Sequence, residues 1–317
     1  LGDVYKRQLT QRELDEIYTP NETEQRFARR LGRSNASRLY LMILLKTVQR
    51  LGYFPMVADV PPSIVSFVTK ALGLKLVPLC ALVEEEKSRS RRDFIDAIRA
   101  HLKIHPITKD TDKAIELAAT QAAQTKQELA DIINVIIEEL IRQRYELPAF
   151  SRLNRTAFRI RNQVNELYYH TLTDPLPAAV TSQFDAMLTL SAGQLVTGWQ
   201  QIKQDPKKPT NTEVRQYLER VKWLKSWACE LPQVDHIPVV KRGQYVYEAR
   251  ALDAADLKAM QQNKRYALMV LLFHAQLSKA LDDAVDIFVR KMRKLHSGAV
   301  EQLQLYYQEH QKRAEKL

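Results

Sequence analysis

Apolar positions recur with a helical period along most of the chain, and over the first 75 residues they do so in short segments. Thr10 followed by Glu13 has the pattern of a capping box, which opens a helix. A broad apolar face lies between residues 35 and 51, and Gly52 suits the left-handed position that ends a helix. We expect four short helices, of the size of a helix-turn-helix module, over residues 9–82.

A second helical module is expected over residues 83–192. It begins with a polar stretch of charges at 84–92, followed by a helix over 91–101. The isoleucine-rich pattern from Thr111 to Tyr145 predicts one long helix, because the apolar residues recur at three- and four-residue spacing. Another helix is expected from Ser151, a capping residue, to about residue 172.

Residues 193–317 are expected to form a third module. The stretch 193–209 has the composition of a linker, and a helix follows from about residue 211 to 228. Residues 232–246 have no clear period, and a short strand is one reading of residues 244–247. A long helix is expected over 265–296. Residues 1–8 have no apolar period and are interpreted as a non-native leader.

Composition favours an all-α fold and a polyanionic partner. The 317 residues include only 8 glycines, too few for the turns of a sheet protein of this size. The net charge is +11 and the isoelectric point is about 9.5, which favours nucleic acid, then an anionic membrane surface, over a protein that is merely basic. Cys80 and Cys229 have no disulfide or zinc spacing, so we expect a cytoplasmic protein. No apolar run is long enough to span a membrane.

Several runs of residues resemble one known family. The most specific is LLKTVQRLGYFP at residues 44–55, preceded by LDEIYTP at 14–20 and FARR at 27–30. The weaker runs VPP at 60–62, ELPAFSRL at 146–153 and NKRYAL at 263–268 follow in the expected order. Together they resemble the N-terminal region of transposases of the Tn-three family, which move bacterial class II transposons by replication.

The resemblance implies a function and its limits. Members are long proteins whose helical front part binds the terminal inverted repeats of the element, and the full-length protein is expected to be a homodimer. A later RNase H-like domain holds a carboxylate triad that binds two magnesium ions and performs strand cleavage and joining. We expect that domain to lie beyond this chain, so we expect no catalytic residue, no metal ligand and no cofactor here, and association with the bacterial nucleoid.

Basic side chains at helical spacing are the candidate contacts to double-stranded DNA. Arginine and lysine replace the counterions along the phosphates, and the arginine fork also suits guanine. The predicted DNA-binding residues are Arg26, Arg29, Arg30, Arg33, Arg38, Lys46, Gln49, Arg50, Arg89, Arg91, Arg92, Arg155, Arg159, Lys207 and Lys208. For each group the alternative is a solvated charged face or linker.

Two other groups of side chains could suggest metal sites, but the sequence argues against both. His101 and His105 are four residues apart but are followed by Pro106, without cysteine or carboxylate partners, which argues against a metal site. The aspartates at 282, 283 and 286 share one helix, so we read them as a charged face. The alternative to the DNA-binding hypothesis is a helical protein-interaction scaffold that dimerises through the late helices and binds DNA only non-specifically.

Overall fold

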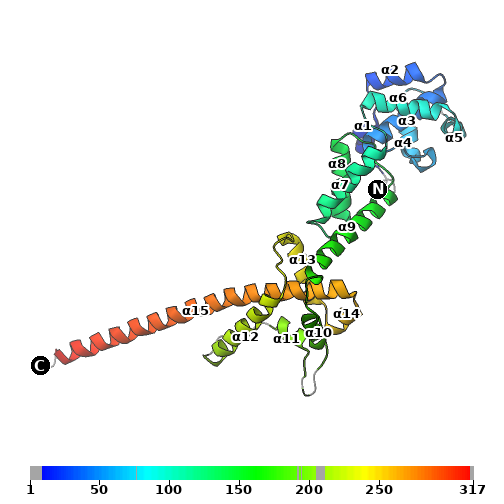
Figure 1. Cartoon of the computed structure of the whole chain (residues 1–317). Coiled ribbons are helices and arrows are strands. Elements are labelled where there is room, and N and C mark those ends of the chain that lie inside the picture. Colours follow the sequence, from blue (N-terminus) through cyan, green and yellow to red (C-terminus); the bar gives the residue numbers. More distant parts are fainter. Residues whose placement is uncertain (1–8, 76, 191–192, 194, 205–210, 315–317) are drawn as a thin grey trace. The chain divides into compact units, whose positions relative to one another are not determined.

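The expectation of an all-α fold is confirmed by the structure, a computed structural model (Figure 1). It describes residues 9–75, 77–190, 193, 195–204 and 211–314, without the side chains of 211–213, 309 and 311–314. Over these residues the only β-type pairing is an isolated bridge between His105 and Tyr145. The helices are α1 (Gln11–Tyr18), α2 (Glu22–Leu31), α3 (Asn35–Leu51), η1 (Val57–Asp59), α4 (Pro62–Ala71), α5 (Leu79–Lys87), α6 (Ser90–Leu102), α7 (Lys109–Ala123), α8 (Leu129–Arg142), α9 (Phe150–Thr173), α10 (Ala178–Met187), α11 (Gly198–Lys203), α12 (Asn211–Glu230), α13 (Val239–Ala251), α14 (Ala254–Ala259) and α15 (Gln262–Ala314).

The chain divides into two compact units, Leu1–Arg161 and Asn162–Leu317. The sequence predicted three modules, with boundaries after residues 82 and 192. Neither of those positions separates the units, because α6 packs on α3 and because α10, α11 and α12 bury side chains in one common core. The division instead falls inside the continuous helix α9, where no turn residue marks it in the sequence.

The first unit is organised around α3. Residues 39–45 of this helix are buried on every side, with at most 1% of each side chain exposed, because α1, α2, α4, α5 and α6 surround it. A helix that is apolar all round must be covered in this way to be stable in water. The helix ends at Gly52, which has a φ of +76°, as expected from the sequence.

Residues 109–142 form a helical hairpin in place of the single helix predicted from Thr111 to Tyr145. The chain turns at residues 124–128, between α7 and α8. The alanines at 118, 119, 122 and 123 make a small-residue face on α7, and the isoleucines at 132, 133 and 136 are buried on α8. Both segments have a helical period, so the period alone does not reveal the turn between them.

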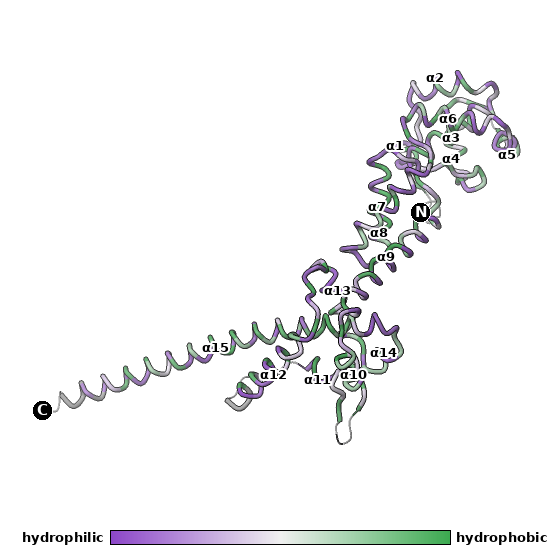
Figure 2. Tube along the Cα trace, in the orientation of Figure 1, coloured by the Kyte–Doolittle hydropathy of each residue, from purple (hydrophilic) through white to green (hydrophobic). Residues whose placement is uncertain are grey.

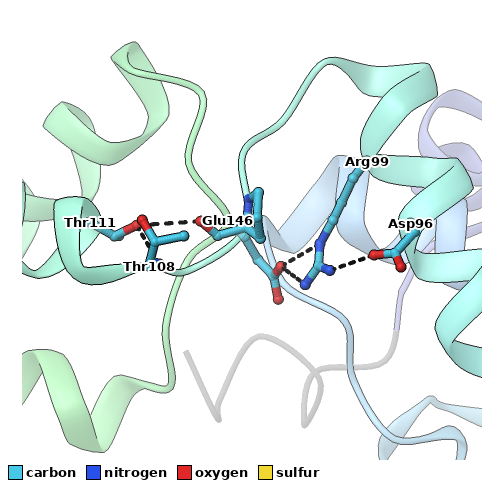
Figure 3. Close-up of polar contacts among 6 residues, drawn as sticks. Asp96, Arg99, Thr108, Thr111 and Glu146 are labelled. Carbon is cyan, nitrogen blue, oxygen red and sulfur yellow. Dashed lines mark hydrogen bonds and ion pairs between the residues drawn. The ribbon is translucent and has the colours of Figure 1, made fainter.

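A set of polar contacts joins the hairpin to the helices around α3 (Figure 3). Arg99 of α6 donates through Nε and Nη2 to one carboxylate oxygen of Glu146, at 3.1 and 2.7 Å, and through Nη1 to Asp96 at 2.9 Å. The backbone of Leu147 donates to the carbonyl of Gly52 at 2.8 Å. The segment after α8 is therefore tied to both α6 and the end of α3.

The second unit packs α10 to α14 against the first part of α15. Its core includes Trp199, Phe184, Tyr245 and Phe273, all of which are 1% exposed or less. The strand considered for residues 244–247 is absent, because these residues belong to α13. Lys241, Tyr245 and Ala249 recur every four residues and face the core. Because one of these inward positions is a lysine, a search for apolar residues at helical spacing does not detect the helix.

Candidate nucleic-acid interface

Helix α2 has one face that is fixed to the protein. Asn21 caps it, and the Glu24 carboxylate accepts hydrogen bonds from the Asn21 backbone and from Gln49 Nε2, both at 2.8 Å. The Lys46 ammonium lies 2.9 Å from the same carboxylate. Glu24, Phe27 and Ala28 are buried. This face holds α2 against α3, and the sequence analysis did not single out Glu24 for that role.

The opposite face of α2 is a set of exposed arginines. Arg26, Arg29 and Arg30 lie within about 100° of one another around the helix, at spacings of three, four and one residues. Arg26 has an ion pair with Glu22 at 3.1 Å, but both side chains are more than three-quarters exposed, so this pair contributes little. Arg33 is exposed in the turn that follows. The Arg30 guanidinium lies over the ring of the buried Phe27, 5.9 Å from its centroid, and its side chain is otherwise exposed.

The turn between α2 and α3 brings the backbone of Gly32 against Arg38. A Cβ on Gly32 would lie 2.6 Å from Cγ and 2.8 Å from the backbone nitrogen of Arg38. Arg38 donates through Nε to the Gly32 carbonyl at 2.9 Å and is partly buried. Arg38 therefore shapes the turn that presents Arg33, and its guanidinium is partly occupied by that contact.

The predicted residues at the end of α3 face different ways. Lys46 is only 6% exposed and is held by Glu24, and the Gln49 amide is turned to the same carboxylate. Arg50 is exposed, in the last turn of the helix. Arg50 and Arg144 both line a cavity of about 500 Å³ beside the end of α3. Of these three predicted contacts, Lys46 is buried, Gln49 is exposed but its amide is hydrogen-bonded to Glu24, and Arg50 is exposed.

The arginines at the start of α6 also divide into inward and outward groups. Arg91 donates through Nη1 to the Tyr40 hydroxyl and to Glu86, both at 2.6 Å. Burial raises the Tyr40 pKa to about 12, although the positive charge of Arg91 acts in the opposite direction. Arg89 and Arg92 are exposed. Together with Arg91 and Arg99 they line a depression of about 630 Å³, which is large enough to admit a phosphate group.

Two contacts place α2 and the turn after it alongside α6, from the end of α6 toward its start. Phe27 of α2 stacks on His101, near the end of α6, with ring centroids 4.5 Å apart. Ser34, just after α2, donates to Glu85 at 3.4 Å, in the last part of α5, the helix that precedes α6. The end of α2 therefore lies toward the beginning of α6. We define the basic surface as Arg26, Arg29, Arg30, Arg33, Arg89 and Arg92.

The arginines of α9 lie against acidic side chains of α7. Arg159 donates to Glu116 at 2.5 Å, and Arg152 pairs with Asp112. Arg155, between them on the helix, is exposed. This face is therefore less positive than the arginine spacing alone suggested. Lys207 and Lys208, the remaining predicted contacts, lie outside the described residues.

Metal-ligating clusters and membrane-spanning helices were also sought among the described residues. No group of three histidine, cysteine or carboxylate side chains in that part of the chain is arranged to hold a metal ion. The ring of His101 stacks on Phe27, and His105 forms the bridge to Tyr145. None of the described helices combines the length and the apolar character that crossing a bilayer requires.

Comparison with known proteins adds a family to this geometry. Residues 3–160 match the model described as "Domain of unknown function (DUF4158)". The chain is 25% identical over 302 residues to the transposase for transposon Tn501 of Pseudomonas aeruginosa, and 27% identical over 304 residues to the transposase for transposon Tn3926 of Escherichia coli. These matches cover 94% and 93% of this chain and 30% of each relative.

The transposase for transposon Tn21 of Escherichia coli is a further relative, 24% identical over 227 residues, which is 70% of this chain and 23% of the relative. The matches to the first two relatives run through both structural units, so the likeness is not confined to the segment covered by the domain model. The chain spans about 30% of the length of these two relatives. The chain is therefore similar to part of a transposase of the Tn-three family.

Proposed function

We propose that this chain is the N-terminal part of a transposase that binds the terminal inverted repeats of a bacterial transposon as double-stranded DNA. The observation that carries the proposal is that α2 has one face packed on α3 and an opposite face of exposed arginines. Its inner face is fixed through Glu24 by Lys46 and Gln49 of α3, and its outer face presents three exposed arginines, with a fourth, Arg33, in the turn that follows. Cations held on a rigid helix suit the recognition of a regular phosphate backbone.

The extent of the basic surface, as well as its charge, favours duplex DNA as the ligand. Arg89 and Arg92 extend it from α2 to the start of α6, and the depression beside them offers space for a phosphate. Phosphate contacts of this kind set the register of a protein on DNA, while sequence is read by a few side chains at base edges. In this proposal strand cleavage and joining, with their magnesium ions, belong to other parts of the transposase. The chain acts on DNA in the bacterial cytoplasm, in association with the nucleoid.

The test compares two DNA duplexes at matched salt concentrations. Fluorescence anisotropy is measured with a labelled terminal inverted repeat and with a scrambled duplex of the same length and composition. We expect tighter binding of the repeat, and an affinity that falls steeply as salt rises. Equal affinity for the two duplexes contradicts recognition of transposon ends.

A triple variant then tests the surface. Arg29→Ala, Arg30→Ala and Arg33→Ala together should lower the slope of log affinity against log salt by about 2.7, since each lost phosphate contact removes about 0.9. The matched control is Arg12→Ala, Lys113→Ala and Arg142→Ala, which removes the same charge from exposed side chains with local acidic partners. Equal effects of the two triple variants would show that only net charge matters.

A protein-interaction scaffold is the second candidate, and one observation favours it. The C-terminal half of α15 carries exposed apolar side chains, which a pure DNA-binding role does not require. A scaffold should bind the repeat and the scrambled duplex equally and weakly. A dimeric transposase subunit would combine specific DNA binding with use of this helix.

A further inference from the structure

Helix α15 has one side that packs on its own unit. Ala280, Ala284 and Ile287 recur at four- and three-residue spacing and face the core of the second unit. The Tyr217 hydroxyl of α12 donates to the Ala280 carbonyl at 2.9 Å and to Asp283 at 3.3 Å. Figure 1 shows α12 beside the first part of α15 only.

A second side of α15 carries a row of exposed apolar residues. It begins at Leu281, one position after Ala280, and is therefore turned by about 100° from the packed side. Its members recur at four- and three-residue spacing, so that all of them lie within roughly 80° around the helix axis. We define the apolar stripe as Leu281, Val285, Phe288, Met292, Leu295, Ala299, Leu303 and Tyr306.

The apolar stripe is too long and too regular for scattered surface residues. Phe288 is 64% exposed and Leu295 is 67% exposed. From residue 281 to 306 the stripe extends for about 38 Å, or more than three heptads. Figure 2 shows apolar positions returning at intervals along this part of the helix. Single exposed apolar residues are normal on a soluble protein, but a contiguous row marks a contact surface.

Between residues 282 and 296 the charges beside the apolar stripe are separated by sign, and Asp286 pairs with Arg290 at 3.8 Å where the two groups meet. Asp282, Asp283 and Asp286 lie before Phe288, and no basic residue lies among them. Arg290, Lys291, Arg293, Lys294 and His296 follow, without an acidic residue. A second α15 in the same direction would place acidic beside acidic and basic beside basic. A second α15 in the opposite direction would place each acidic half beside a basic half, and it would also oppose the two helix dipoles.

We propose that α15 pairs with α15 of a second copy of this chain, antiparallel, through the part of the apolar stripe from Leu281 to Leu295, with the two-fold axis near residue 289. This inference rests on the dimeric form of the proposed function and names its surface and direction. Antiparallel pairing gives a two-fold symmetric contact, in which the same residues are used by both copies. The apolar stripe provides the affinity. Exposed charges are screened beyond about 8 to 10 Å in ordinary buffer, so only charges that lie side by side across the contact affect the pairing. These neighbouring charges favour the antiparallel direction.

Sedimentation equilibrium of the 317-residue chain, without DNA, tests the pairing. We expect a dimer at tens of micromolar, and at least about 100-fold weaker association for Phe288→Glu with Leu295→Glu, because a carboxylate is costly to bury. The control is Ser297→Glu with Gln304→Glu, which adds the same charge on the opposite side of the helix and should leave the dimer intact. A chain that is monomeric at about 100 µM, or a control that dissociates equally, overturns the proposal.

The direction is tested by electron spin resonance distances between copies. Cys80 and Cys229 are exposed, so both are first changed to serine, and a spin label is attached at Gln304→Cys. Antiparallel pairing about residue 289 separates the two labels by about 45 Å. Parallel pairing brings them within about 25 Å and overturns the antiparallel arrangement. Neither experiment contains DNA, so the failure of this proposal and the failure of the DNA-binding proposal give different results.

Discussion

The ammonium of Lys46 lies 2.9 Å from the carboxylate of Glu24, and both side chains are less than 10% exposed. Gln49 and the backbone of Asn21 complete the hydrogen bonds of that carboxylate. Burying two charges is costly, and a pair of this kind is tolerated because its geometry and its additional hydrogen bonds compensate the loss of water. Its effect on the molecule is to hold α2 in one orientation, with the arginines outward.

Glu24→Gln is expected to destabilise the first unit by about 3 kcal/mol, because it leaves the Lys46 ammonium buried without a counter-charge. Urea denaturation monitored by circular dichroism measures the change. Glu16→Gln, which breaks the exposed pair of Glu16 with Arg12, should cost less than about 1 kcal/mol. Comparable losses for the two variants would contradict the role given to burial.

The stability of the first unit should depend on pH through Glu24. Burial acts to raise the Glu24 pKa, but hydrogen bonds from Gln49, Lys46 and Asn21 outweigh it, and the pKa is lowered from its ordinary value of 4.5. A lowered pKa contributes stability that is complete above pH 4.5 and is lost as the pH falls through the folded-state pKa. Unfolding midpoints measured from pH 7 to pH 3 should therefore fall more for the unaltered chain than for Glu24→Gln. Parallel curves would show that Glu24 does not contribute.

The sequence predicts the helices and which residues share a face of each helix. It does not predict which face a neighbouring helix covers. The spacing of Arg26, Arg29 and Arg30 placed them on one face, and they lie there. The same spacing cannot show which residues a neighbouring helix will cover, so Lys46 and Arg91 were grouped with exposed cations although each has an internal partner. Tertiary contacts decide this, and they involve residues such as Glu24 and Tyr40 that are distant in the chain.

The helical hairpin and α13 illustrate a second limit. A helical period continues through the turn between α7 and α8, because both helices bury faces with the same spacing. In α13 the inward position 241 is a lysine that is fully buried, with its ammonium 5.5 Å from the centre of the Tyr245 ring. An apolar count fails there, since the lysine occupies a core position through its long stem and a cation–π contact.

Gly52→Ala is expected to destabilise the chain more than Gly73→Ala. Both glycines have positive φ, +76° and +64°, so each substitution meets backbone strain of about 1 kcal/mol or more. A Cβ at Gly52 would also lie 2.7 Å from the Leu147 side chain, whereas no atom lies within 4 Å of one at Gly73. Thermal unfolding of both variants gives the difference. Equal losses would mean that Leu147 moves aside without cost.

Arg99→Met should loosen the hairpin from the helices around α3. The substitution keeps most of the apolar stem but removes three hydrogen bonds to Glu146 and Asp96, of which the pair to the partly buried Glu146 is worth about 1 to 3 kcal/mol. Hydrogen exchange of the backbone amides of Glu146 and Leu147, which donate to His105 and Gly52, should become faster. Exchange within α3 should change less, and equal acceleration throughout the unit would indicate global destabilisation instead.

Arg91 and Arg92 are adjacent in sequence, but we expect substitution of Arg91 to lower stability and substitution of Arg92 to weaken DNA binding. Arg91→Ala removes the hydrogen bonds to Tyr40 and Glu86 and leaves the Glu86 carboxylate with one fewer donor, so the free energy of unfolding should fall by about 1 to 3 kcal/mol. Arg92→Ala removes an exposed cation from the basic surface and should leave stability within about 0.5 kcal/mol.

The binding measurement completes that comparison. Arg92→Ala should weaken the binding of any duplex and lower the salt slope by about 0.9, as expected for one phosphate contact. Arg91→Ala should leave the slope unchanged at a temperature where the variant remains folded, because its guanidinium is already held by internal partners. A lower slope for Arg91→Ala would show that Arg91 leaves Tyr40 and Glu86 to meet the phosphate, and would add it to the basic surface. An unchanged slope for Arg92→Ala would remove the start of α6 from the DNA-binding surface and confine the surface to α2.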